Sequence, residues 1–182
     1  MVGARTFLRF FGAIAVTLPL VSIALAMAVN PWFSVFKGAF SDLGGEAAFD
    51  PWIFNCGLVA SALFVAAFSL ALIRLSRNRL ETVGGSFLIV ASLFLAMIGI
   101  FHEGTYPHDF VSYWFFAQAD LAVGALGAGN LLAHQVGKGV SLLAWSLIWP
   151  AVAMLVPWPS IATLEAFGIG SLDAAVLILI VR

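Results

Sequence analysis

Six apolar stretches of the chain are long enough to cross a membrane as helices. A transmembrane helix needs about 20 consecutive, mainly apolar residues. Turn-forming or charged residues such as Asn30-Pro31, Asp50-Pro51 and Tyr106-Pro107 separate the stretches. We therefore expect an all-α protein, a polytopic integral membrane six-helix bundle forming a single transmembrane domain over residues 1–182. The predicted helices cover about 10–29, 53–75, 83–101, 113–133, 140–156 and 161–181, with a structured outer loop at 30–52.

The composition excludes a water-soluble fold. The chain is 63% hydrophobic and 9% charged, whereas roughly a quarter of the residues of soluble domains are charged. Its one cysteine, Cys56, excludes an intramolecular disulfide, a CxxC redox pair and a cysteine-rich metal site. We expect membrane lipids as partners and no nucleic acid. The composition does not determine the oligomeric state.

The first apolar stretch allows two interpretations. Basic residues, an apolar run and the small pair Ala24 and Ala26 resemble a signal peptide that is cleaved. The apolar run, however, is longer than a signal core of roughly 7 to 15 residues. This length favours a helix that is retained in the membrane.

The basic residues predict the orientation of the bundle. Lys and Arg accumulate in short cytoplasmic loops. In the six-helix topology only Lys37 falls on the opposite side from the others, which are Arg5, Arg9, Arg74, Arg77, Arg79, Lys138 and Arg182. We therefore expect a multi-pass plasma-membrane protein with cytoplasmic N and C termini and with the loops at 30–52 and 102–112 facing outward.

Polar residues gather in the outer half of the predicted helices, whereas the inner half is nearly featureless. Ionisable groups inside a membrane are costly, so they face other helices, water or a ligand. We expect an extracytoplasmic cavity whose substrate-binding residues are Asn55, Ser112, Gln118, Asp120 and Glu165. Asp173 follows Glu165 by two turns and can share its helix face. The alternative is that these groups form interhelical hydrogen bonds, worth about 0.6 kcal/mol each on average.

The stretch IFHEGTYPHDFVS is a candidate metal site. Its ligand types suit zinc or another divalent metal, and the candidate ligands are His102, Glu103, His108 and, from the other outer loop, Asp42. The spacing differs from HExxH, and Pro107 prevents a regular helix between the two histidines. The alternative is a short polar loop at the level of the lipid headgroups.

Five short motifs resemble those of an uncharacterised prokaryotic family of six-helix membrane proteins, known as domain of unknown function nine-nine-eight. They are N-P-W at Asn30–Trp32, S-D-L-G at Ser41–Gly44, N-x-G at Asn55–Gly57, F-x-E-G at Phe101–Gly104 and H-x-x-x-S at His108–Ser112. The resemblance implies a six-helix bundle and no particular activity. Proline is more frequent in that family at the position of His102. The resemblance therefore favours Glu103, His108 and Asp42 over His102 as metal ligands.

Two classes of function remain open, and whether the protein is an enzyme is uncertain. One is a metal-assisted hydrolase or transferase for a lipid or isoprenoid, with Glu103, His108, Asp42 and Ser41 as catalytic residues. The other is a lipid-binding, scaffold or transport protein that uses the same cavity without chemistry.

Overall fold

The computed structural model describes residues 2–181, and the regular secondary structure in that range is entirely helical. All six α-helices are long and apolar enough to cross a membrane, so the expected all-α, six-helix membrane fold is confirmed. A short 3-10 helix, η1, lies between the first two. The bounds are α1 (Val2–Val29), η1 (Phe40–Gly44), α2 (Trp52–Arg74), α3 (Arg79–Ile100), α4 (His108–Leu132), α5 (Val136–Leu155) and α6 (Ile161–Ile180).

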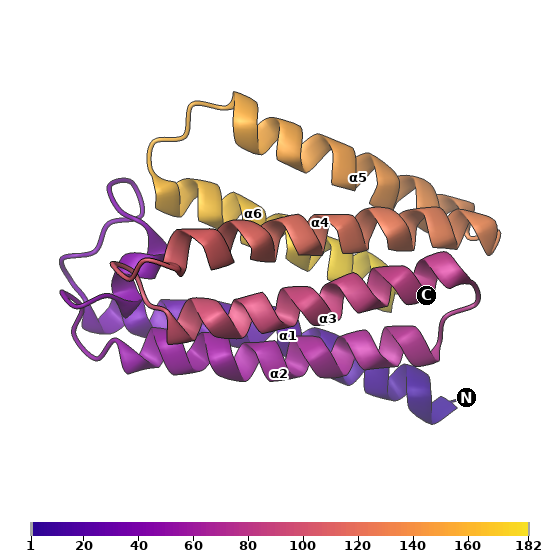
Figure 1. Ribbon diagram of the computed structural model, residues 1–182, viewed down its shortest axis with the longest axis horizontal. Helices are drawn as coiled ribbons and strands as arrows, with labels where there is room; N and C mark the ends of the chain where they lie inside the picture. Colours follow the sequence, from indigo (N-terminus) through magenta and orange to yellow (C-terminus); the bar gives the residue numbers. More distant parts are fainter. Residues whose placement is uncertain (1, 182) are drawn as a thin grey trace.

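The helices run up and down in sequence order (Figure 1). Each helix packs against the next one along the chain, and α6 returns to pack against α1. η1 packs against α1, α2 and α6 at one end of the bundle. We call this the η1 end, and the opposite end, where the chain begins and finishes, the terminal end.

Three helices begin four or five residues earlier than the apolar pattern predicts. They are α3 at Arg79, α4 at His108 and α5 at Val136. A first helical turn accepts polar residues because its N–H groups lack intrahelical partners. Asn78, for example, caps α3 by accepting a hydrogen bond from the Glu81 N–H at 3.1 Å. The early start of α4 places His108 and Ser112 one turn apart on a single helix face.

Glycines permit close contacts between neighbouring helices. A Cβ atom on Gly99 of α3 would lie 2.4 Å from the carbonyl oxygen of Asn55 on α2. A Cβ atom on Gly127 of α4 would lie 2.8 Å from the backbone nitrogen of Leu143 on α5. Small residues at such crossings let van der Waals packing hold membrane helices together.

The expected structured loop, residues 30–51, is fixed to both neighbouring helices. The buried Asn30 side chain donates to the Ala26 and Phe49 carbonyls and accepts from the Phe49 N–H. On the other side, the Ala162 N–H at the start of α6 donates to the Gly38 carbonyl at 2.7 Å. The loop therefore covers the η1 end as an ordered cap.

Candidate functional site

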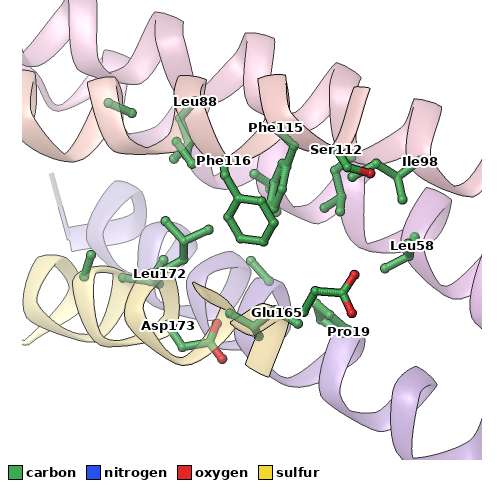
Figure 2. Close-up of a pocket in the computed structure, with 18 of the residues that line it drawn as sticks. Pro19, Leu58, Leu88, Ile98, Ser112, Phe115, Phe116, Glu165, Leu172 and Asp173 are labelled. Carbon is green, nitrogen blue, oxygen red and sulfur yellow. The ribbon is translucent and has the colours of Figure 1, made fainter. Parts of the chain in front are cut away.

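A narrow cavity of about 140 Å³ runs inside the bundle from the η1 end towards the terminal end. It is lined by α1, α2, α3, α4, α6 and η1, and none of its lining residues comes from α5. Most of the lining is apolar. Figure 2 shows Glu165, Leu172 and Asp173 on one side and Ser112, Phe115 and Phe116 across the cavity. The polar side chains in the lining are Ser41, His108, Ser112, Glu165 and Asp173.

Four side chains form a hydrogen-bonded polar cluster at the η1 end of this cavity: Ser41, Glu103, His108 and Ser112. The Nε2 atom of His108 lies 3.1 Å from Glu103 Oε2 and 3.5 Å from Ser112 Oγ. Ser41 Oγ donates to the same Glu103 oxygen at 2.8 Å. The cluster thus joins η1, the loop between α3 and α4, and the first turns of α4.

The His108 ring is held by a backbone carbonyl. Its Nδ1 atom lies 2.7 Å from the Phe101 carbonyl oxygen, and the residue is only 4% exposed. Because a carbonyl oxygen only accepts hydrogen bonds, Nδ1 carries a proton and donates it. Nε2 is then the ring atom that faces Glu103 and Ser112.

Glu165 closes the same end of the cavity from α6. Its Oε2 atom accepts a hydrogen bond from the Phe40 N–H at 2.5 Å, which ties α6 to η1. The charges of Asp42 and Glu103 act on its carboxyl group. Three carboxyl groups and one imidazole therefore surround the η1 end of the cavity, which makes it acidic.

Asp173 lies deeper in the cavity. It follows Glu165 by eight residues, or about 12 Å along the helix axis, and both line the cavity. The expected shared helix face is confirmed. Within residues 2–181 the Asp173 carboxyl group makes no hydrogen bond or ion pair. An acidic group at this depth is costly unless water, a proton or a ligand satisfies it.

Three of the expected substrate-binding residues do not line the cavity. Asn55 donates to the Gly44 carbonyl at 2.9 Å and so fastens η1 to α2. Asp120 accepts from Trp149 Nε1 at 2.8 Å and links α4 to α5. Gln118 and Asp120 lie outside the lining because they occupy other faces of α4 than His108 and Ser112. Glu165 and Ser112 are the members of the expected set that do line it.

The expected metal ligands are only partly gathered. Glu103 and His108 are paired, whereas Asp42 accepts from the Ala39 N–H at 2.8 Å and His102 Nδ1 lies 2.9 Å from its neighbour's carbonyl oxygen. Within the described range, no three His, Cys, Asp or Glu side chains are grouped to hold a metal ion. Metal binding at this loop stays a prediction.

The half of the bundle at the terminal end, which the sequence predicts to be nearly featureless, contains a cavity with polar lining residues. A second cavity, of about 450 Å³, lies at the terminal end and is lined by Arg5, Arg9, Arg77 and Lys138. The seven basic residues on one side of the predicted topology were the signal for it, although the sequence did not indicate that four of them surround one space. The Phe101 carbonyl and the Phe40 N–H, which position His108 and Glu165, are backbone groups and leave no signal in the sequence.

Together, these features define a polytopic all-helical membrane protein with an interior cavity that ends in an acidic polar cluster. The chain belongs to the family described as "Protein of unknown function (DUF998)", whose model matches residues 13–182. The family resemblance of the motifs is therefore confirmed, and the family description assigns no activity. Neither the curated proteins nor the solved structures gave a match to this chain.

Proposed function

We propose that the protein binds one slender amphiphile, with the apolar chain in the interior cavity and the polar end at the Ser41, Glu103, His108 and Ser112 cluster. The observation that supports this most directly is an apolar cavity that ends at a polar cluster near one membrane surface. Such a space matches a molecule that is apolar along its length and polar at one end.

The size of the cavity favours a single chain. Pockets for drug-sized ligands typically measure about 300–1,000 Å³, whereas this one measures about 140 Å³. A two-tailed lipid would not fit without moving a helix. α6 is the least buried of the six helices, with 17% of its most apolar stretch buried, and it is the helix whose displacement would open the cavity to the bilayer.

The charge of the cavity favours a polar end that donates hydrogen bonds. Glu165 lines the η1 end of the cavity, and Glu103 lies behind Ser41 and His108. Asp173 offers a further acceptor about 12 Å deeper. Carboxylates attract a cation and repel a phosphate of like charge. An amine or a hydroxyl is therefore the preferred headgroup, in contrast to a phosphate.

The test compares dodecylamine, dodecanol and dodecyl phosphate, which share one chain length, in nanodiscs of phosphatidylcholine. We expect dodecylamine to bind at least tenfold more tightly than dodecyl phosphate, since a tenfold ratio corresponds to about 1.4 kcal/mol. Ala119→Leu, which adds a side chain to the cavity wall, should abolish binding, and Ala117→Leu on the exposed face of α4 should not. Equal binding by both variants, or preference for the phosphate, would contradict the proposal.

A second candidate is a hydrolase acting on an ester of such an amphiphile, favoured by the Ser112 Oγ to His108 Nε2 distance of 3.5 Å. Ser112 Oγ would attack the ester carbonyl carbon while Nε2 takes the hydroxyl proton and gives it to the departing alcohol. Water would then release the acid from the acyl-serine. This step requires Nε2 to exchange its contact with Glu103 for one with Ser112.

The esterase candidate is tested with p-nitrophenyl laurate. The candidate would be supported if the wild type releases p-nitrophenol, the Ser112→Ala variant does not, and the Ser41→Ala variant keeps most of the activity. No release of p-nitrophenol above background, or equal rates in wild type and Ser112→Ala, would leave binding without chemistry as the function.

We also propose that the terminal end faces the cytoplasm of a plasma-membrane protein, because seven of the eight basic residues of the sequence belong to this side. A membrane-impermeant maleimide tests this in intact cells carrying Cys56→Ser. Glu46→Cys at the η1 end should be labelled, and Gly137→Cys at the terminal end should be labelled only after lysis. The reverse pattern would overturn the orientation.

A further inference from the structure

The cavity at the terminal end has an unbalanced positive charge. Its lining includes Arg5, Arg9, Arg77 and Lys138, contributed by α1, the loop between α2 and α3, and α5. Glu81 is the one acidic side chain among the lining residues. With a volume of about 450 Å³, the space lies within the usual range for a ligand pocket.

Glu81 is fully engaged by one of the four cations. It accepts hydrogen bonds from the backbone N–H of Arg77 at 2.7 Å and from the guanidinium Nε at 3.0 Å. The guanidinium also donates to Asn130 Oδ1 at 3.0 Å. Arg5, Arg9 and Lys138 form no ion pair with any acidic side chain of residues 2–181. Among residues 2–181, three positive charges therefore remain around the cavity without an acidic partner.

The other contacts of these cations leave donors unused. Arg9 Nε donates to the Ile180 carbonyl at 3.2 Å, and Lys138 Nζ donates to the Val181 carbonyl. Basic side chains favour such carbonyls at the end of a helix. A guanidinium group carries five N–H donors and an ammonium group three, so each residue keeps further donors for a ligand.

The repulsion among the cations is a cost that an anion would relieve. Lys138 lies within Coulombic reach of Arg5, Arg9 and Arg77. Like charges held this close together repel one another. The apolar part of the cavity wall, which includes Leu8, Leu72, Leu126 and Leu179, keeps an anion at the terminal end and offers a surface for hydrocarbon.

We propose that the terminal-end cavity is a binding site for a phosphate group. Guanidinium forks match phosphate oxygens in pairs, and basic pockets between transmembrane helices bind phosphorylated lipid headgroups. Two sources supply this chemistry, a phospholipid headgroup from the surrounding leaflet or a small phosphorylated molecule from solution. The proposed phosphate site lies at the opposite end of the bundle from the polar cluster, and Leu126 and Leu179 belong to the walls of both cavities.

The experiment measures binding to the purified protein in neutral detergent by native mass spectrometry. The probes are dioleoyl phosphatidylglycerol, dioleoyl phosphatidylcholine and inorganic phosphate. Two double variants are compared. The cavity double variant combines Arg9→Gln and Lys138→Gln, and the matched double variant combines Arg74→Gln and Arg79→Gln. The matched pair lies at the same end of the bundle and outside the cavity lining.

We expect the wild type to prefer phosphatidylglycerol to phosphatidylcholine. The cavity double variant should bind phosphatidylglycerol about thirtyfold more weakly, as expected for two basic groups near a membrane surface. The matched variant should change affinity by less than about threefold. Because Arg9 and Lys138 also contact α6, Arg5→Gln provides a second test with one charge removed, and about a fivefold loss is expected.

Phosphatidylglycerol binding that inorganic phosphate does not displace would support the proposal with a lipid as the source. Binding of inorganic phosphate that disappears in the cavity double variant would support it with a small phosphorylated molecule as the source. Equal binding of the two lipids by the wild type, without any phosphate binding, would overturn the proposal. Equal losses in the cavity and matched double variants would overturn it too.

Discussion

Asn30 is expected to be the main anchor of the cap over the η1 end. Its side chain is 1% exposed and makes four hydrogen bonds, to the Ala26 carbonyl, to both backbone groups of Phe49 and to Trp32 Nε1, at 2.7 to 3.0 Å. Asn30→Ala removes all four. At about 0.6 kcal/mol per bond, the average within membranes, the loss is about 2 kcal/mol. At about 1 kcal/mol per bond it reaches about 4 kcal/mol.

This loss is measured as thermal unfolding in detergent. For a chain of this size, 1 kcal/mol corresponds to a shift in Tm of about 2–4 °C, so Asn30→Ala should lower Tm by roughly 5 to 15 °C. The matched control is Asn55→Ala, which removes one hydrogen bond, to the Gly44 carbonyl, and should lower Tm by about 1–4 °C.

A second variant separates hydrogen bonding from lost volume. Asn30→Asp keeps the acceptor that receives the Phe49 N–H and Trp32 Nε1 but places a second acceptor against the Ala26 and Phe49 carbonyls. It should therefore destabilise the protein despite its nearly identical shape. A Tm of Asn30→Ala within about 2 °C of the Tm of Asn55→Ala, or an unchanged Tm in Asn30→Asp, would show that these hydrogen bonds do not anchor the cap.

Three other substitutions test the packing and the assignment of roles. Gly99→Ala would push a Cβ to 2.4 Å from the α2 backbone and should cost about 1–3 kcal/mol by thermal unfolding, whereas Gly170→Ala, with no atom within 4 Å, should be neutral. Glu81→Gln should cost about 1–2 kcal/mol, because the buried acceptor of Arg77 loses its charge while the arginine stays partly solvated; an unchanged Tm would count against that pair. Asp120→Asn keeps an acceptor for Trp149 and should leave both Tm and dodecylamine binding unchanged; loss of binding would place Asp120 in the site after all.

The helices could be predicted because each one places a long apolar stretch in the membrane. The residues at which they begin could not be predicted. Apolar runs mark where hydrocarbon surrounds the chain, whereas a first turn such as His108 to Val111 contains polar residues and lies outside the apolar run. The prediction placed His108 in a loop for this reason. Its true place on α4 is what brings its ring within reach of Ser112.

The depth of the site residues could be predicted, and their direction around each helix could not. The sequence placed Ser112, Gln118 and Asp120 in the same half of one helix, but only Ser112 lines the cavity. The cavity-lining positions of α4 are spaced by three or four residues, as on one face of a helix. The lining positions of α4 include His108, Ser112, Phe115, Ala119, Ala122 and Leu126. That spacing was the signal that could have separated Ser112 from Gln118 and Asp120.

Photolabelling tests directly whether the interior cavity holds the chain of an amphiphile. Dodecylamine with a diazirine on its chain is added to the protein in nanodiscs, irradiated and mapped by peptide mass spectrometry. We expect labels on cavity-lining residues of α4 and α6, such as Phe116, Ile169 and Leu172, and we expect excess unlabelled dodecylamine to suppress them. Labels confined to lipid-facing residues such as Leu147 and Ile148 of α5, or cavity labels that excess dodecylamine does not reduce, would contradict it.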